Sequence, residues 1–326
     1  MKPSGKNLDY LIVQALRDDS GYFSGEELAS KLGISRQALW KHISNLTDRG
    51  YDITAVPHRG YKLVSSPDKF YPEEVKYKLG TKFLATQVYY YDAVDSTQKI
   101  AWQLGLEGAP EGTIVFTETQ SKGRGRLERK WISPAGGIYF SLLLRPKSLL
   151  LSEITQISLI ISLACLKGIK ETTGIDCQVK WPNDILVSGK KLGGVLCEIN
   201  AEADRVLFLI AGVGININSK DLPSGATSLH LYAKKKFRRL DITQEIIRQI
   251  EAAYLKVQQG ESGELLAEWS KSCILWGKHL ELKLSGKIIE GTAVNIDDKG
   301  YLILRVDNGT QHKVSAGDIV KVRSCR

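Results

Sequence analysis

The chain has 326 residues, of which 43% are hydrophobic and 25% charged, a composition typical of a globular protein with more than one domain. Its formal net charge of +9 suits an anionic partner such as DNA, a nucleotide or an acidic protein, although a basic surface can also be inert. The five cysteines contain no CxxC pair and the five histidines no HExxH set, which argues against a zinc site and for reduced thiols in a cytosol.

Neither export nor membrane insertion is predicted. The first residues lack a long apolar core of the kind found in signal peptides. The apolar run at 159–166 is interrupted by serine and closed by Lys167, so it is too short to span a bilayer. We therefore expect a cytoplasmic protein without a membrane partner.

The first segment carries three helix patterns. Residues 7–18 have apolar side chains at i, i+3, i+4 and i+7, which predicts a helix with one buried face. Ser24 and Glu27 match a capping box at the start of a second helix, and Gly33 ends it. Ser35 is a good N-cap for a third helix. Two helices joined by a glycine turn, the second with a polar face, indicate a helix-turn-helix.

The polar face of the third helix predicts DNA binding. A hairpin with a basic tip follows at 51–64, which makes the motif a winged helix-turn-helix with the wing placed against the DNA backbone. The alternative is a small three-helix packing unit with a solvated face, but the complete motif spacing and the basic wing favour DNA. The side chains expected to contact phosphates and base edges are Ser35, Arg36, Gln37, Lys41 and His42 on the helix and Arg59 on the wing.

A mixed segment and an all-strand segment follow a proline-containing linker at 65–75. The strands come in clusters, which favours an α+β fold over a doubly wound sheet. Even hairpins after residue 275 predict an SH3-like barrel. In the mixed segment we predict strands at 88–94, 112–119, 137–145, 176–181, 192–200 and 205–217, and helices at 152–173, 242–259 and 264–275. The expected domains are 1–65, 66–275 and 276–326.

The loop GRGRLERKW at 123–131 holds three arginines and a lysine around two glycines. It is no dinucleotide fingerprint, because the third glycine of GxGxxG is missing, and the GxxxxGK[ST] phosphate loop occurs nowhere. A nucleic-acid patch, a disordered basic turn and a clamp for a small phosphate-bearing ligand stay open on local composition.

Other motifs favour the clamp. KWPND at 180–184 places a lysine at a strand end before a fixed turn, although this could be a salt-bridged strand terminus. DSTQ at 95–98 gathers small donors and acceptors and could also be a helix N-cap. The glycines of KKLGGVLCE at 190–198 and GVGIN at 212–216 permit close approach of backbone to a ligand or to another strand.

Together these motifs resemble the biotin protein ligases, in the family's order and over nearly the whole central segment. With the winged helix and the C-terminal barrel, the chain resembles the bifunctional type, which is ligase and biotin operon repressor in one chain. The resemblance implies that biotin and ATP form biotinoyl-5′-AMP, with Mg²⁺, and that biotin then passes to a lysine of a biotin carboxyl carrier protein. It also implies a liganded homodimer that binds a palindromic operator with biotinoyl-AMP as corepressor.

The resemblance also implies roles for individual residues. Lys180 and Arg126 are the catalytic pair, which stabilise charge on the α-phosphate and the carboxylate. The biotin-binding set is Ser96, Thr97, Gln120, Arg124, Arg126, Lys180, Gly193 and Gly194. The ATP-binding set is Arg126, Arg129, Trp131, Lys180 and Asn216, with Trp131 facing adenine. Asp184 would hold Mg²⁺ or position Lys180.

One departure from the family pattern is Glu128, where many members have glycine. An acidic side chain here could pair with a neighbouring arginine and alter closure of the loop. Three other interpretations stay open: a ligand-sensing transcription factor without turnover, a ligase with a vestigial winged helix, and a lipoate ligase. Intact Lys180 and Arg126 argue against the first of these, the polar helix and basic wing against the second, and the loop with KWPND against the third.

Overall fold

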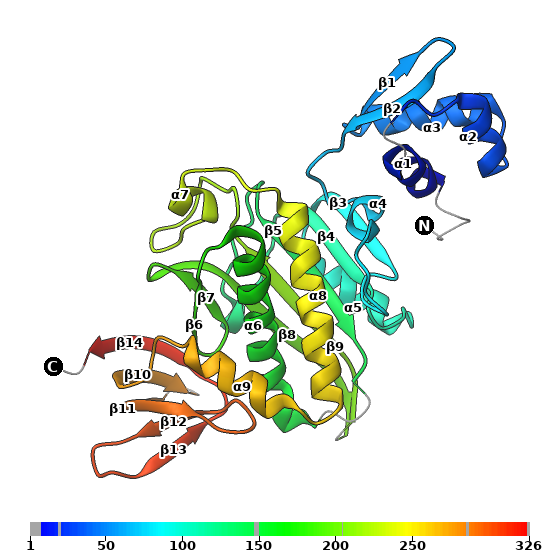
Figure 1. Ribbon diagram of the computed structural model, residues 1–326. Coiled ribbons are helices and arrows are strands. Elements are labelled where there is room, and N and C mark those ends of the chain that lie inside the picture. The colour runs from blue at the N-terminus through cyan, green and yellow to red at the C-terminus, as the bar shows by residue number, and fades with distance from the viewer. Residues whose placement is uncertain (1–7, 19–20, 147–149, 204, 285–286, 325–326) are drawn as a thin grey trace. The chain divides into compact units, whose positions relative to one another are not determined.

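The computed structural model describes residues 8–18, 21–146, 150–203, 205–284 and 287–324, in two compact units divided after Leu79 (Figure 1). The first unit therefore includes the stretch expected to be a linker, and ends 14 residues later than the expected boundary at 65. Within the described residues, no helix is long and apolar enough to cross a membrane. The α+β class predicted from the sequence is confirmed.

The first unit is a winged helix-turn-helix. Its elements are α1 (Leu8–Asp18), α2 (Gly25–Leu32), α3 (Arg36–Asp48), β1 (Asp52–Val56), β2 (Gly60–Ser65) and α4 (Pro72–Lys76). Gly33 ends α2 in the left-handed conformation, and Ser35 caps α3 by accepting a hydrogen bond from the backbone N–H of Ala38 (3.1 Å). The capping box expected at Ser24 is wrong, because its side chain makes no capping hydrogen bond.

Two buried carboxylates fasten α4 to the helices before it. Glu74 binds Arg17 of α1, and Glu73 binds Arg49 directly after α3. Burial raises the pKa of Glu73, and the neighbouring Arg49 opposes that shift. These residues explain why the supposed linker packs as part of the DNA-binding unit: each buried acid has an arginine partner.

The second unit is built on a seven-stranded sheet in the order β3-β4-β5-β9-β8-β7-β6. Only β3 and β4 are parallel among its neighbouring pairs. Its strands are β3 (Val88–Val94), β4 (Ile114–Gln120), β5 (Ile138–Leu144), β6 (Gln178–Lys180), β7 (Asp184–Val187), β8 (Lys190–Glu202) and β9 (Arg205–Ile215). Six of them match predicted strands, and β7 was not predicted.

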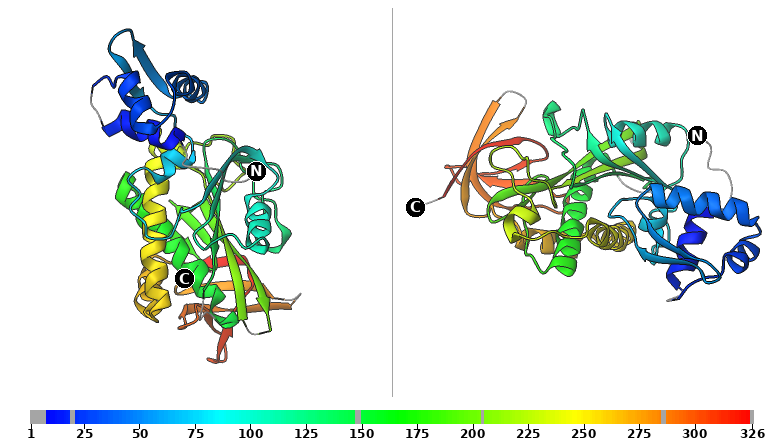
Figure 2. Two further views of the ribbon diagram at one scale, coloured as in Figure 1. Left: turned by 90° about the vertical axis from the view of Figure 1, so that its right-hand side faces the viewer. Right: turned by 90° about the horizontal axis from the view of Figure 1, so that it is seen from above.

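Helices cover both faces of this sheet. The long helices α6 (Ile154–Thr173) and α8 (Arg239–Gln258) pack together on one face, and α5 (Thr97–Leu106) lies on the other (Figure 2). Every residue of β5 is buried, as expected for a central strand covered on both sides. The shorter helices are α7 (Leu229–Ala233) and α9 (Ser262–Lys271), the latter ending four residues before its predicted end, together with one-turn helices at Arg126–Glu128 and Leu151–Glu153.

The C-terminal strands form a five-stranded antiparallel sheet in the order β13-β12-β11-β10-β14. These strands are β10 (Lys278–Leu284), β11 (Lys287–Ile296), β12 (Leu302–Arg305), β13 (Gln311–Val314) and β14 (Asp318–Ser324). Leu280, Leu282, Leu302 and Leu304 are fully buried and form the centre of its apolar side. The predicted all-strand segment is thus confirmed.

Candidate active site

One pocket in the second unit collects the motifs singled out in the sequence. It is formed by the start of α5, the end of β4, the 123–131 loop, β5, the KWPND turn, β8 and β9, and by the turn between β13 and β14. Segments more than 200 residues apart thus meet at one place. Ten predicted site residues line it: Ser96, Thr97, Gln120, Arg124, Arg126, Arg129, Trp131, Lys180, Asp184 and Gly194.

The glycine-arginine loop is a folded hairpin in this structure. The backbone N–H of Trp131 donates to the Gly123 carbonyl (2.9 Å), and that of Gly125 donates to the Arg129 carbonyl (2.7 Å). A Cβ on Gly123 would lie 2.5 Å from the Trp131 carbonyl oxygen, so only glycine fits there. These contacts contradict the interpretation of this loop as a disordered basic turn.

The three arginines of the loop meet different partners. Arg124 lies 3.7 Å from the Glu198 carboxylate on β8, and Arg129 pairs with Asp318 at the start of β14 (Nη1 to Oδ1, 3.0 Å). Arg126 is half-buried in the pocket wall. Burial lowers the pKa of its guanidinium, while Asp318 and Asp184 act in the opposite direction. A half-buried guanidinium without a tight ion pair is suited to an incoming anion.

The backbone of the loop turns at Leu127 and Glu128, which both have positive φ values (54° and 57°). Left-handed backbone costs an L-residue about 1–2 kcal/mol and costs glycine nothing. The departure at Glu128 therefore falls on a backbone conformation that favours glycine. The expected pairing of Glu128 with a neighbouring arginine is not found among the ion pairs of the described residues.

Lys180 ends β6 with its side chain half-buried at the pocket. Its backbone pairs with Asp184 across the turn, but the Asp184 carboxylate binds Lys191 instead (2.6 Å). One of the two expectations was that Asp184 positions Lys180. The structure shows no ion pair between them among the described residues. Asn183 closes the other side of the turn by donating from Nδ2 to the Val195 carbonyl (3.0 Å).

The indole of Trp131 forms a flat wall of the pocket. The Lys191 ammonium lies 5.5 Å from its ring centroid, within range of a cation–π contact. The Trp131 Nε1 atom is buried and has no hydrogen-bond partner among the described residues. A Cβ on Gly214 would lie 2.7 Å from this nitrogen, so the glycine of β9 makes room for the ring.

Gly214→Ala should therefore push Trp131 out of place. If the ring stacks on adenine, we expect about a tenfold rise in KM for ATP, because base–aromatic stacking contributes about 1–3 kcal/mol. Binding of biotin alone should change little. Pyrophosphate release at varied ATP measures the effect, with Gly263→Ala as the control because no atom lies within 4 Å of a Cβ there. An unchanged KM would contradict the stacking role.

The far end of the pocket is lined with small polar groups. Gln120 accepts from the backbone N–H of Thr97 (2.9 Å) and donates to the Ser133 hydroxyl (3.0 Å). The Thr97 and Ser141 hydroxyls are 2.8 Å apart. The Ser96 hydroxyl is buried without a partner among the described residues. An orphaned polar group in a pocket wall indicates a place for a polar ligand group.

Two predicted residues do not line the pocket. Gly193 faces β9, where a Cβ would lie 2.6 Å from the Gly214 carbonyl, so this glycine permits strand packing rather than ligand contact. Asn216 is buried and donates to the Thr227 carbonyl (3.1 Å), which fastens the segment before α7. Sequence reasoning missed Gln98, Ser141, Lys191 and Asp318; Gln98 and Lys191 lie inside the recognised motifs, whereas Asp318 carries no sequence signal.

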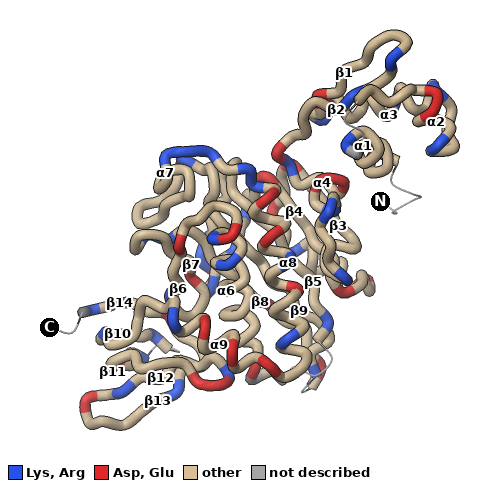
Figure 3. The backbone as a smooth tube through the Cα atoms, in the orientation of Figure 1, with Lys and Arg blue, Asp and Glu red and all other residues tan. Residues whose placement is uncertain are grey.

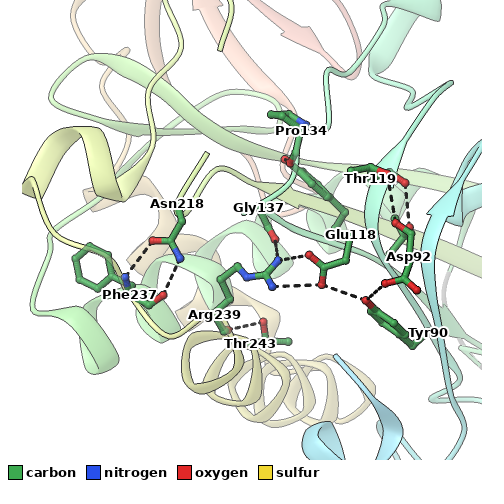
Figure 4. Close-up of polar contacts among 12 residues, drawn as sticks. Tyr90, Asp92, Glu118, Thr119, Pro134, Gly137, Asn218, Phe237, Arg239 and Thr243 are labelled. Carbon is green, nitrogen blue, oxygen red and sulfur yellow. Dashed lines mark hydrogen bonds and ion pairs between the residues drawn. The ribbon is translucent and has the colours of Figure 1, made fainter. Parts of the chain in front are cut away.

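A buried ion pair supports the strands behind the pocket (Figure 4). Arg239 at the start of α8 binds Glu118 of β4 (2.8 and 3.2 Å) and donates to the Gly137 carbonyl before β5 (3.0 Å). Tyr90 of β3 contacts the same carboxylate (3.4 Å). Three neighbouring strands and the helix behind them are thereby tied together, two residues before Gln120.

Five of the six residues predicted to contact DNA are exposed to solvent in the first unit. They are Ser35 at the N-cap of α3, Arg36, Gln37 and Lys41 on α3, and Arg59 in the wing, where its guanidinium lies 4.4 Å from the Tyr22 ring centroid. His42 differs, since its Nδ1 binds Asp9 of α1 (2.7 Å) and the side chain is half-buried. The structure thus gives His42 a packing contact with α1, and a contact with DNA stays a prediction for this residue.

Comparison with known proteins gives the family. The biotin/lipoate A/B protein ligase family model matches residues 90–216, an HTH domain model 10–62, and the biotin protein ligase C-terminal domain model 276–322. The bifunctional ligase/repressor BirA of Bacillus subtilis (strain 168) is 37% identical over 96% of this chain and 97% of its own. BirA of Escherichia coli (strain K12) is 29% identical over 90% and 91%.

A solved structure agrees with this. The biotin protein ligase from Aquifex aeolicus in complex with biotin and ATP is similar with a TM-score of 0.64 and 30% identity, over 74% of this chain and 100% of that one. The chain therefore belongs to the family of bifunctional biotin protein ligases and repressors.

Proposed function

We infer that the chain is an ATP-dependent ligase that activates biotin as biotinoyl-5′-AMP and transfers it to a carrier protein, and that it is also a DNA-binding repressor. The observation that carries the ligase activity is the pocket, in which Lys180 and Arg126 converge with a flat indole and an orphaned serine hydroxyl. No side-chain nucleophile is required, since the biotin carboxylate itself attacks the α-phosphate.

We propose that Lys180 and Arg126 stabilise the negative charge that develops as this carboxylate approaches the α-phosphate and pyrophosphate leaves. Both cations lack a tight ion pair within the described residues, so they are available to the anion. Arg124 and Arg129 would contribute to phosphate and carboxyl binding after exchanging Glu198 and Asp318 for ligand oxygens. Such exchange lets the loop hold the adenylate away from water.

The proposed biotin end is formed by Ser96, Thr97, Gln120 and the backbone of Gly194. Ser96 supplies an unused hydroxyl, which suits the ureido group of biotin because that group both donates and accepts hydrogen bonds. Trp131 would stack on adenine. Asn216 and Gly193 do not line this pocket, and the Oδ1 atom of Asn216 has no partner among the described residues.

We propose that Mg²⁺ enters with ATP. The two carboxylates that line the pocket, Asp184 and Asp318, are each paired with a cation, Lys191 and Arg129. Among the described residues no group of three or more His, Cys, Asp or Glu could hold a metal. The pocket therefore suits an Mg²⁺ ion that is held mostly by phosphates and water. Among the described residues, Asp184 is the candidate for a direct protein ligand.

The ligase activity is tested by incubating the chain with ATP, Mg²⁺, biotin and a biotin carboxyl carrier domain. Mass spectrometry of the carrier should show the gain of one biotinyl group, and omission of ATP should abolish it. Lipoate in place of biotin should give no gain. A carrier that remains unmodified while the ligase is folded would sink the proposal.

We propose three functional domains, the winged helix at 1–65, the catalytic domain at 66–275 and the C-terminal domain at 276–326, although the structure packs 66–79 with the winged helix. Biotinoyl-AMP would favour a homodimer, which would present two winged helices to a palindromic operator in the cytoplasm. Sedimentation with and without biotin and ATP tests this. A sedimentation coefficient that does not rise with ligand would contradict the liganded dimer.

The DNA contacts are tested on α3. Arg36→Ala combined with Lys41→Ala should lower affinity at least tenfold for a duplex that the chain selects from a random pool with biotin and ATP, since each lost phosphate or base contact costs about 1–3 kcal/mol. Exposed lysines also occur away from α3, for example Lys234–Lys236 after α7 (Figure 3), so a control must show that the loss is not an effect of overall charge. Lys283→Ala with Lys287→Ala is the matched control, because it removes the same net charge from the C-terminal sheet. Equal losses in both double variants would contradict specific contacts by α3.

A further inference from the structure

Lys180 is held in the pocket by its backbone and not by an ion pair with a described residue. Lys191 and Arg129 are each oriented by a carboxylate, whereas Lys180 has no ion pair with any described residue. The position of its ammonium group therefore depends on how firmly β6 and the KWPND turn are held. Even a displacement of about 1 Å of a catalytic group can cost about a hundredfold in rate.

Both edges of β6 are fastened before the turn begins. On one side it pairs with β7. On the other, Val179 donates to the Ser272 carbonyl (3.0 Å) and accepts from the N–H of Ile274 (3.1 Å). These bonds fix the strand up to Lys180, but they do not reach the turn itself.

The turn is held through Trp181, the residue next to Lys180. Its side chain is only 1% exposed, and its Nε1 donates to the backbone carbonyl of Gly300 (3.1 Å). Gly300 belongs to the turn between β11 and β12 in the C-terminal sheet. A Cβ on Gly300 would lie 2.8 Å from Leu159 of α6, so this turn is packed tightly against the helix below the central sheet.

Asp297 shapes the acceptor turn. Its Oδ1 accepts from the backbone N–H groups of Lys299 (3.0 Å) and Tyr301 (2.9 Å), and its Oδ2 binds the Lys313 ammonium of β13 (3.1 Å). The side chain of Asp297 is 7% exposed. The buried carboxylate of Asp297 therefore holds the backbone of this turn in place, and with it the Gly300 carbonyl.

We propose that the 297–301 turn of the C-terminal sheet is a positioning element for the adenylation step, with Trp181 and Asp297 as positioning residues that set the place of the Lys180 ammonium. This deepens the proposed function, because it rests on the role of Lys180 there. The C-terminal sheet then contributes to catalysis through the 297–301 turn, besides lining the pocket with Asp318.

The test is Trp181→Phe, which removes the indole N–H and keeps an aromatic ring. Trp269→Phe is the matched control: Trp269 is also 1% exposed, and its Nε1 donates to the Ser162 hydroxyl (2.9 Å) between α9 and α6 and not to the 297–301 turn. Both variants should lower the thermal midpoint by similar amounts. Only Trp181→Phe should lower kcat for pyrophosphate release, by about tenfold, with KM for biotin changed less than threefold.

The same substitution is then made in a Lys180→Ala background. If Trp181 acts through Lys180, the loss from Trp181→Phe should disappear there. Asp297→Asn retains one acceptor oxygen for the backbone of the turn but loses the ion pair with Lys313. It should also lower kcat, and it replaces Trp181→Phe in the test if that variant does not fold. A kcat loss that is equal for Trp181→Phe and Trp269→Phe, or that persists without Lys180, would overturn the positioning role. If Lys180→Ala itself retains the wild-type rate, the proposed catalytic role fails instead.

Discussion

Lys180→Ala should lower the rate of biotinoyl-5′-AMP formation by about 10²–10³-fold, the usual loss when one preorganised donor to a developing negative charge is removed. The ammonium is half-buried at the end of β6 and is not neutralised by a described carboxylate. The low local dielectric strengthens its attraction to the α-phosphate oxygens. Pyrophosphate release with saturating biotin and ATP measures the loss, and carrier biotinylation should fall in parallel.

Lys170→Ala is the control for this substitution. Lys170 lies on α6, is exposed and pairs with Asp176 at the surface (2.7 Å). Removing it should leave the rate within about twofold, as is usual for an exposed ion pair. A Lys180→Ala protein that is folded, binds biotin and still releases pyrophosphate at a tenth or more of the normal rate would refute the assigned role.

Arg126→Ala should lower adenylate formation about 10- to 100-fold and also let the intermediate escape. The guanidinium is half-buried, and no ion pair of the described residues competes for it as Asp318 does for Arg129. Its loss removes a charge-assisted contact from the loop that covers the pocket. Ultrafiltration followed by mass spectrometry should find free biotinoyl-AMP in the filtrate at a higher ratio to biotinylated carrier.

Lys122→Ala tests whether any cation of this region would do the same. Lys122 precedes the loop, is exposed and pairs with Asp95 (2.9 Å), but it does not line the pocket. Its removal should change neither the formation nor the release of the adenylate. Equal leakage from the Lys122 and Arg126 variants would mean that the loop acts by overall charge and not by a contact from Arg126.

The departure at Glu128 acquires a physical meaning from the backbone. Its left-handed conformation would be easier for glycine, which also has more freedom in the open loop. Compared with glycine, Glu128 therefore makes the observed turn less favourable, but it also leaves the loop fewer other conformations. Its effect on the adenylate follows from this balance of loop conformations, because no described arginine pairs with its carboxylate.

Local sequence was sufficient for most of the long elements and for the motifs that line the pocket, but it did not reveal α5, α7 or β7. Period-3.6 and β-branched patterns located α6, α8 and six strands of the central sheet, because those segments bury long apolar faces. β7 was not predicted, because a four-residue strand directly after a turn has too few positions to show an alternation of apolar and polar residues. The motifs around Ser96, Arg126 and Lys180 identified the pocket, since their charge and glycine spacing suit a phosphate ligand.

Tertiary structure alone decided what partners those side chains have. Helical spacing predicts that His42 faces DNA, but it cannot show that His42 also binds Asp9, 33 residues earlier. Asp184 pairs with Lys191 instead of Lys180, and the Nδ2 of Asn216 donates to the Thr227 carbonyl. From the C-terminal sheet, more than 100 residues after Lys180, Asp318 lines the pocket and Gly300 accepts a hydrogen bond from Trp181. Periodicity and motif spacing report which residues a chain supplies, whereas ion pairs and hydrogen bonds between distant segments depend on how the sheets and helices pack.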